Sequence, residues 1–190
     1  MVRHGGLPEL ENFAPYAPAG AGAKGIATAM ARQIPSSHDC SEIGRIRALW
    51  PGTLVIKGIM DPRDAVLAFD TGANAVTVSN HGGNKSDRMP AAIHMLSDVV
   101  RAVGAERPVL FDGGIRQGSD VITALGLGAA FCMLGRAPLY GAMAGGTRGV
   151  LRAIDILHAD IRRTQVMMGC PTVLDFTPEL IMSHTGPRAI

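Results

Sequence analysis

Four clusters of glycine and polar residues follow four short apolar runs of the chain. They are Lys57-Gly58, the SNHGG stretch at 79–83, the DGGIR stretch at 112–116, and Gly135-Arg136. In parallel α/β proteins, ligands bind at the carboxyl ends of strands, and these clusters would meet there if the apolar runs are strands. Their residue types suit two kinds of chemistry, the binding of an anion and the transfer of a proton.

The anion chemistry rests on three glycines and two arginines. Glycine leaves backbone N–H groups accessible to an anion, and a guanidinium group matches the geometry of phosphate oxygens. The residues concerned are Gly113, Gly114, Gly135, Arg116 and Arg136. They predict a phosphate pocket in the loops after the last two strands, a recurring feature of (β/α)8 barrels. The alternative is that both arginines are solvated surface charges.

The proton chemistry rests on His81, which lies between an apolar run and two glycines. An imidazole with a pKa near ~6.5 suits general-base work, and the glycines leave access to it. The alternative is a structural histidine. Lys57 follows another apolar run and is interpreted either as a fixed positive charge at a ligand or as a surface lysine with a packed aliphatic stem.

The elements that position these clusters alternate along the chain. Short β-branched or apolar runs predict strands, and apolar residues at helical spacing predict helices. The predicted strands cover 53–59, 75–79, 108–112 and 130–134, and the predicted helices cover 41–50, 62–71, 90–103, 119–125 and about 149–168. Without hairpin signals, this order implies parallel pairing through right-handed crossovers.

Helix boundaries follow from capping residues. Ser41, Asp61 with Pro62, and Ser119 are the predicted N-terminal caps. The helix at Asp61 should turn Val66, Leu67 and Phe69 inward and end at Gly72. The helix near Ser119 should point its positive end at the phosphate pocket.

Composition bounds the class of protein. The chain has 190 residues, 47% apolar and 18% charged, with a net charge of +2. This composition excludes a disordered chain, and the lack of a dense basic stripe argues against a nucleic-acid partner. No apolar run reaches ~18 residues, so no membrane span is expected, and no secretory signal is seen.

Three widely spaced cysteines argue against a disulfide framework or a zinc site and favour a reduced, cytoplasmic setting. Cys132 is interpreted as a residue that packs in the core.

Three regions are expected. Residues 1–38 are rich in glycine and proline and are predicted to be a loop or arm containing one or two helical turns. Residues 39–170 carry the alternating elements, and residues 171–190 form a polar tail.

Four motifs resemble one family in both sequence and order. LVIKGI (54–59), VSNHGG (78–83), DGGIRQGSDV (112–121) and LGR (134–136) are similar to the FMN-dependent α-hydroxy acid dehydrogenases and oxidases, which include L-lactate dehydrogenase, glycolate oxidase and mandelate dehydrogenase. The resemblance covers roughly residues 39–170, and the HGGLPELENFAP stretch near the start is similar to a mobile loop of the family. It implies the C-terminal half of a TIM (β/α)8 barrel, with four βα units, and FMN as the cofactor.

The resemblance also implies roles for single residues. Lys57 would lie at the flavin N1–O2 edge, Ser79 would hydrogen-bond the flavin, and Asp112 would hold the ribityl chain. His81 would accept a proton from a 2-hydroxy acid as a hydride equivalent passes to flavin N5, giving the 2-oxo acid. The remaining cofactor-binding residues, mostly at the phosphate, would be Gly113, Gly114, Ile115, Arg116, Gly135 and Arg136.

One position departs from the family pattern, in which Asn-His-Gly-Gly is followed by an arginine that pairs with the substrate carboxylate. Asn84 stands at that position. An amide cannot make the bidentate pair with a carboxylate, and the adjacent Lys85 should point elsewhere. A similar asparagine occurs in relatives that oxidise a mycofactocin precursor, so a substrate without a carboxylate is the alternative.

Four βα units make half of the implied barrel. Its terminal strands would have unpaired backbone groups, and its inward faces would be partly bare. We therefore expect self-association, pairing with a separate N-terminal half, or marginal stability. A truncated flavin- or phosphate-binding half-barrel without catalysis, or a subunit of a split enzyme, are the further alternatives. Relatives dock to membranes through the loop that residues 1–38 resemble, which leaves peripheral membrane contact open beside a cytoplasmic location.

Overall fold

The computed structural model describes residues 11–33, 39–84, 86 and 88–181. The chain divides into two compact units, Met1–Asp39 and Cys40–Ile190. In the first unit a 3-10 turn, η1 (Glu11–Tyr16), precedes the helix α1 (Ala23–Gln33), which buries Ile26. This helix has 11 residues, which extends the one or two turns expected there. Most of the HGGLPELENFAP stretch, at 4–10, lies outside the described residues.

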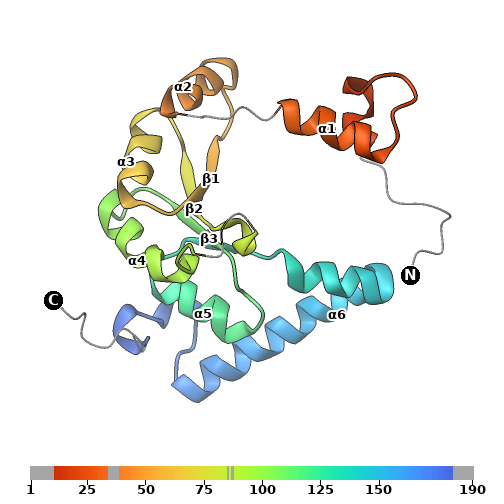
Figure 1. The fold of residues 1–190 in the computed structure, drawn as a ribbon. Helices are drawn as coiled ribbons and strands as arrows, with labels where there is room; N and C mark the ends of the chain where they lie inside the picture. The colour runs from red at the N-terminus through yellow and green to blue at the C-terminus, as the bar shows by residue number, and fades with distance from the viewer. Residues whose placement is uncertain (1–10, 34–38, 85, 87, 182–190) are drawn as a thin grey trace. The chain divides into compact units, whose positions relative to one another are not determined.

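The second unit is built on one parallel sheet (Figure 1). Its strands are β1 (Val55–Ile59), β2 (Ala75–Val78), β3 (Val109–Asp112) and β4 (Phe131–Met133), paired in the order β1-β2-β3-β4. All three pairs are parallel, which confirms the predicted α/β class and strand pairing.

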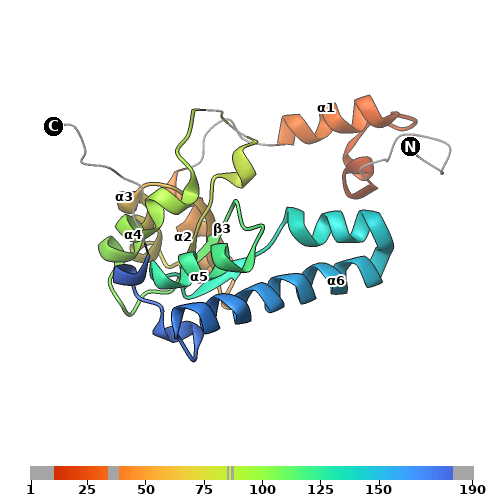
Figure 2. The same ribbon diagram turned by 90° about the horizontal axis from the view of Figure 1, so that it is seen from below.

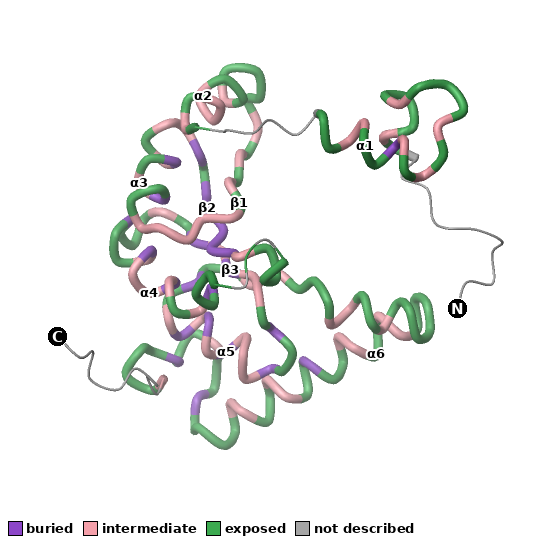
Figure 3. The backbone as a smooth tube through the Cα atoms, viewed as in Figure 1, coloured by how far each residue is buried: buried purple, intermediate pink, exposed green. Residues whose placement is uncertain are grey.

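Burial differs between the middle and the edges of this sheet (Figure 3). Every residue of β2 is buried. Within the part of the chain that the structure describes, β1 and β4 each have a single neighbouring strand, and Val55 is 40% and Phe131 62% exposed. The bare edges expected for half of a barrel are therefore present, and β1 is less buried than its apolar sequence suggested.

In the described part of the second unit, five α-helices accompany the strands. They are α2 (Cys40–Leu49), α3 (Pro62–Asp70), α4 (Ala92–Val103), α5 (Gly118–Gly126) and α6 (Arg136–Met168). Helices α3, α4 and α5 follow one another along one side of the sheet (Figure 1). The main core lies between this row of helices and the strands, and includes Val76, Val78, Leu96, Val99 and Phe111.

Helix α3 forms as its sequence predicts at both ends. The Asp61 Oδ1 atom accepts a hydrogen bond of 2.8 Å from the Arg63 backbone N–H, and Gly72 follows the helix with a φ of +111°. The expected inward face is wrong at Leu67, which is 48% exposed. The helix instead turns Ala65 and Ala68 to the core, because these small residues permit close packing against the sheet and α4.

Two predicted caps are corrected by the structure. Helix α2 begins at Cys40, so Ser41 lies in its first turn, and its apolar residues Ile46 and Leu49 are exposed. Helix α5 begins at Gly118, and Gln117 is its cap in place of Ser119. Gln117 and Asp120 form a reciprocal capping box, a motif that satisfies two backbone donors at once.

Helix α6 begins at Arg136, well before the predicted start near Gly149. Its backbone leaves helical geometry at Gly145 and Gly146, and the chain turns back there as a helical hairpin (Figure 2). A side chain at Gly141 would overlap the backbone of Gly149, and the reverse also holds, so the two arms touch backbone to backbone.

The segment after α6 is partly packed. It contains the 3-10 turns η3 (Val173–Asp175) and η4 (Pro178–Leu180). Phe176 is buried with Ile122 of α5 and Cys170, so this part of the expected polar tail joins a small second core. Residues 182–190 lie outside the described residues. Among the helices that are described, none combines the length and apolar character needed to cross a bilayer.

Candidate active site

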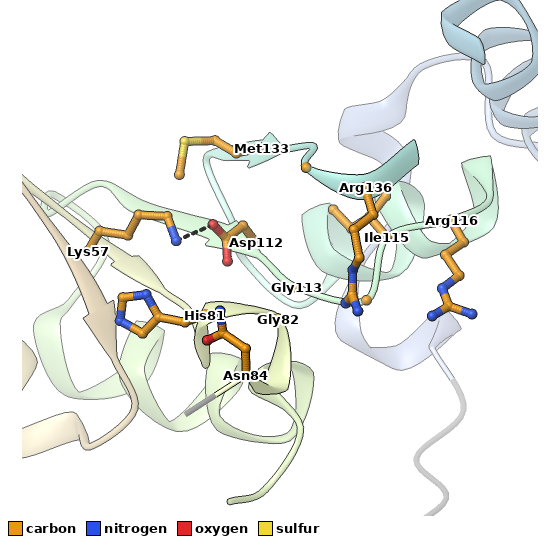
Figure 4. Close-up of a pocket in the computed structure, with 12 residues that line it drawn as sticks. Lys57, His81, Gly82, Asn84, Asp112, Gly113, Ile115, Arg116, Met133 and Arg136 are labelled. Atoms are coloured by element: carbon orange, nitrogen blue, oxygen red, sulfur yellow. Dashed lines mark ion pairs between the residues drawn. The ribbon is translucent and has the colours of Figure 1, made fainter. Parts of the chain in front are cut away.

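The carboxyl ends of the four strands surround a cavity of about 390 Å³ (Figure 4). Its lining residues come from the last residues of the strands and the segments that follow them: Lys57, His81, Gly82, Asn84, Asp112, Gly113, Gly114, Ile115, Arg116, Met133, Gly135 and Arg136. The structure therefore brings together ten of the eleven residues that the sequence singled out. Ser79 is the exception, because it is fully buried and does not line the cavity.

Lys57 of β1 is held by two partners, one at the end of β3 and one just after β2. Its Nζ atom lies 2.5 Å from Asp112 Oδ2 and donates a hydrogen bond of 2.9 Å to Ser79 Oγ. Lys57 stands opposite Thr77 of β2, and Thr77 stands opposite Leu110 of β3. Asp112 is the last residue of β3, two positions further on, so the long lysine side chain reaches across β2 to the carboxyl end of β3. The lysine is fixed in place, with part of its charge offset by the carboxylate.

His81 is held in an uncommon backbone conformation. Among the described residues it is the non-glycine residue with a positive φ, +56°. Such a conformation typically costs on the order of 1–3 kcal/mol and persists when the surroundings enforce it. The backbone N–H of His81 donates a hydrogen bond of 3.1 Å to Ser79 Oγ, so the buried serine fixes both Lys57 and His81.

The imidazole of His81 lies against a glycine of β1. A Cβ atom at Gly58 would stand 2.8 Å from His81 Nε2, closer than side chains approach one another. Gly58 has a φ of +101° and lies where the pairing of β1 with β2 shifts register. This irregularity in the strand makes room for the ring.

Arg116 and Arg136 lie at the end of the cavity away from Lys57 and His81 (Figure 4). Neither side chain forms a hydrogen bond or ion pair with another described residue, whereas Lys57 is paired. At Gly114 and Gly135 a Cβ atom would meet no atom within 4 Å, so the backbone borders open space. This end therefore combines two free guanidinium groups with accessible backbone, which suits a phosphate group.

The predicted contribution of the helix near Ser119 is corrected. The backbone N–H groups of Arg116 and Gln117 donate to Asp120, and those of Gly118 and Ser119 donate to Asp160. Because carboxylates already occupy these donors, the start of α5 is not open to a second anion.

Two residues that line the cavity, Gly82 and Met133, were not predicted as site residues from the sequence. A Cβ atom at Gly82 would lie 3.5 Å from the Arg136 guanidinium, so this glycine provides the surface on which the arginine rests. The position of Gly82 within the SNHGG stretch is the sequence signal that could have identified it as a lining residue. Met133 ends β4 and is paired with Asp112, which faces the cavity, so strand register would have found it. Asn84 lines the cavity as expected, and Lys85 lies outside the described residues.

Comparisons with known proteins agree on one family. The model of the FMN-dependent dehydrogenase family matches residues 8–183. Pre-mycofactocin synthase from Mycobacterium tuberculosis is 46% identical over 157 residues, covering 83% of this chain and 39% of that protein. (S)-mandelate dehydrogenase from Pseudomonas putida is 38% identical over 184 residues, covering 97% of this chain and 46% of that protein.

Solved structures give the same result. A crystal structure of the monotopic membrane protein (S)-mandelate dehydrogenase matches with a TM-score of 0.86 at 38% identity, covering 95% of this chain and 47% of that one. The chain thus spans less than half the length of each of these relatives.

Proposed function

The chain belongs to the FMN-dependent dehydrogenase family, and from that premise we propose that its cavity forms the phosphate end and the proton-accepting side of a flavin active site. The proposed reaction is oxidation of a 2-hydroxy acid to the 2-oxo acid. The fold agrees with this role, because its four parallel βα units correspond to about half of the barrel of the solved relatives.

One observation carries the proposal. The cavity has two unlike ends. At one end Arg116 and Arg136, whose side chains have no partner among the described residues, lie beside accessible glycine backbone, and at the other the Lys57–Asp112 pair lies beside His81. A ligand that carries a phosphate at one end and a redox-active ring at the other fits this division. FMN is such a ligand, and a volume of about 390 Å³ lies within the range of pockets that hold small ligands.

The residues of this chain then have distinct roles. Arg116 and Arg136, with the Gly113-Gly114-Ile115 backbone and Gly135, hold the phosphate, and Asp112 holds the ribityl chain. His81 takes the hydroxyl proton of the substrate, and Ser79 keeps Lys57 and the His81 backbone in place. Bound FMN supplies the hydride acceptor. Lys57 contributes a fixed positive charge close to that acceptor.

The test is binding of FMN against riboflavin, which has the same ring and lacks the phosphate. Fluorescence titration of the whole chain should show a clear preference for FMN. Arg136→Ala should remove roughly tenfold or more of the FMN affinity, because a hydrogen bond to a charged group contributes about 1.5–3 kcal/mol. Equal affinity for the two flavins would refute the phosphate cradle.

Chemistry is tested separately from binding. Anaerobic addition of (S)-mandelate or L-lactate should bleach the bound flavin, and His81→Ala should prevent this. Bound flavin that never bleaches would favour the non-catalytic half-barrel. Bleaching that requires an added N-terminal half-barrel would favour a split enzyme.

A second candidate substrate class is favoured by one residue. Asn84 lines the cavity where a charged partner for a substrate carboxylate is expected, and pre-mycofactocin synthase is among the most similar relatives, at 46% identity. A substrate without a carboxylate, such as a peptide-derived amine, agrees with a neutral amide there. Asn84→Arg should improve turnover of a small hydroxy acid; unchanged turnover would count for the second class.

A further inference from the structure

We propose that Asp160, on the returning arm of α6, is a positioning residue that sets the loop carrying Arg116 against the start of α6 at Arg136. Asp160 does not line the cavity. The proposal rests on the proposed function, because it concerns the geometry of the phosphate cradle.

Two carboxylates hold the segment 116–119, which leads from the glycine loop into the first turn of α5. Asp120 Oδ2 accepts hydrogen bonds from the backbone N–H groups of Arg116 at 2.8 Å and Gln117 at 2.9 Å. Asp160 Oδ2 accepts from those of Gly118 at 2.7 Å and Ser119 at 3.4 Å. Four consecutive backbone donors are therefore satisfied, and one of the two acceptors comes from a helix more than forty residues away.

Packing shows that this contact is built into the fold. A Cβ atom at Gly118 would lie 2.7 Å from the backbone oxygen of Leu157, so α5 begins directly on the backbone of α6. Below this point Ile122 of α5 is buried against Ile161 of α6. The Asp160 carboxylate is itself oriented by Arg163, whose guanidinium lies 3.0 Å from Oδ1.

Helix α6 thereby touches both halves of the cradle. Its first residue is Arg136, and its returning arm holds the segment that begins with Arg116. The two arms are locked together where Gly141 meets Gly149 (Figure 2). The hairpin therefore constrains the backbone at Arg116 and Arg136 relative to each other, and Asp160 transmits this constraint through the Gly118 and Ser119 amides.

The sign of the effect separates positioning from plain electrostatics. A carboxylate near a phosphate site repels the phosphate, so loss of its charge alone would tighten FMN binding. If Asp160 acts by positioning, its loss would loosen the segment and weaken FMN binding. The two explanations predict opposite results for the same substitution.

The experiment compares Asp160→Ala and Asp160→Asn with Asp155→Ala. Asp155 is exposed on the same helix and makes no hydrogen bond or ion pair with any other described residue, so it controls for the loss of one negative charge. The readouts are the dissociation constants of FMN and riboflavin and the hydrogen exchange of the Gly118 and Ser119 amides in the flavin-free chain.

Asp160→Ala should weaken FMN binding about tenfold, with riboflavin binding unchanged and exchange at the Gly118 amide faster. Asp160→Asn should retain most of the affinity, because its amide oxygen still accepts the hydrogen bonds. Asp155→Ala should match the wild type. If Asp160→Ala does not fold, Asp160→Asn still carries the test, since the charge explanation predicts tighter FMN binding for it.

Three results would overturn the proposal. FMN binding that is unchanged or tighter in both Asp160 variants would refute positioning and leave the phosphate cradle standing. An unchanged exchange rate at Gly118 in Asp160→Ala would show that the contact does not hold the segment. A wild-type chain that binds FMN and riboflavin equally would remove the cradle and the role of Asp160 together.

Discussion

Gly58→Ala should displace the His81 imidazole. The added Cβ atom would stand 2.8 Å from Nε2, and ordinary contact begins at 3.4 Å, so the ring must move by at least 0.6 Å (3.4 − 2.8). A misplacement of 1 Å can reduce catalysis about a hundredfold. We therefore expect roughly a tenfold loss of flavin reduction by substrate, with FMN affinity unchanged.

Gly83→Ala is the matched control. Gly83 has a φ of +82°, close to the +101° of Gly58, and a Cβ atom there would meet nothing within 4 Å. Both substitutions bear the strain of a positive φ, about 1–2 kcal/mol, so their melting temperatures should fall together. Only Gly58→Ala should touch the ring.

The assay is the NMR signal of the His81 imidazole in the flavin-free chain, assigned among the six histidines with His81→Gln. Gly58→Ala should shift this signal and Gly83→Ala should leave it in place. Equal shifts in both variants would show that backbone strain, and not the contact between Gly58 and the ring, governs the position of His81.

Two further predictions concern ionisation. Burial raises the pKa of the Cys132 thiol to about 11, so about one thiol in a thousand is ionised at pH 8; mass spectrometry should find slow alkylation at pH 8 that accelerates toward pH 11, and rapid labelling at pH 8 would contradict this. Hydrogen bonds from the Arg63 side chain and backbone lower the pKa of Asp61 from 3.8 to about 2. Because the folded pKa is depressed, the contribution of this cap to α3 is complete above about pH 4 and is lost as the pH falls through 2; an Arg63 amide resonance that already moves near pH 4 would count against the cap.

Sequence patterns predicted the parallel sheet because its middle strands are short apolar runs that end at glycine or polar residues. Ala75 to Val78 is followed by Ser79 and, two residues later, by His81, and α3 begins at Asp61-Pro62 with the predicted cap and first-turn proline. The cavity followed from the same logic, since parallel strands end at one edge and bring Lys57, Asp112 and Arg136 together.

The errors arise where tertiary contacts decide. The last helix was predicted to start near Gly149, yet α6 starts at Arg136 and turns back on itself, and its two arms come into backbone contact at Gly141 and Gly149. Ser119 looked like a cap, but α5 begins one residue before it, at Gly118, with Gln117 as the cap and Asp120 accepting from the backbone N–H groups of Arg116 and Gln117. No local pattern could show that Asp160 reaches Gly118 across more than forty residues.

The turn between the arms of α6 offers a place to modify the protein without disturbing its cavity. Gly145 and Gly146 are exposed, and a Cβ atom at either would meet nothing within 4 Å. Exposed tips of this kind accept inserted sequence readily, and the Gly141–Gly149 crossing isolates the tip from the rest of the hairpin. A peptide tag inserted there would let the protein be attached to an electrode or a bead through residues that do not line the cavity.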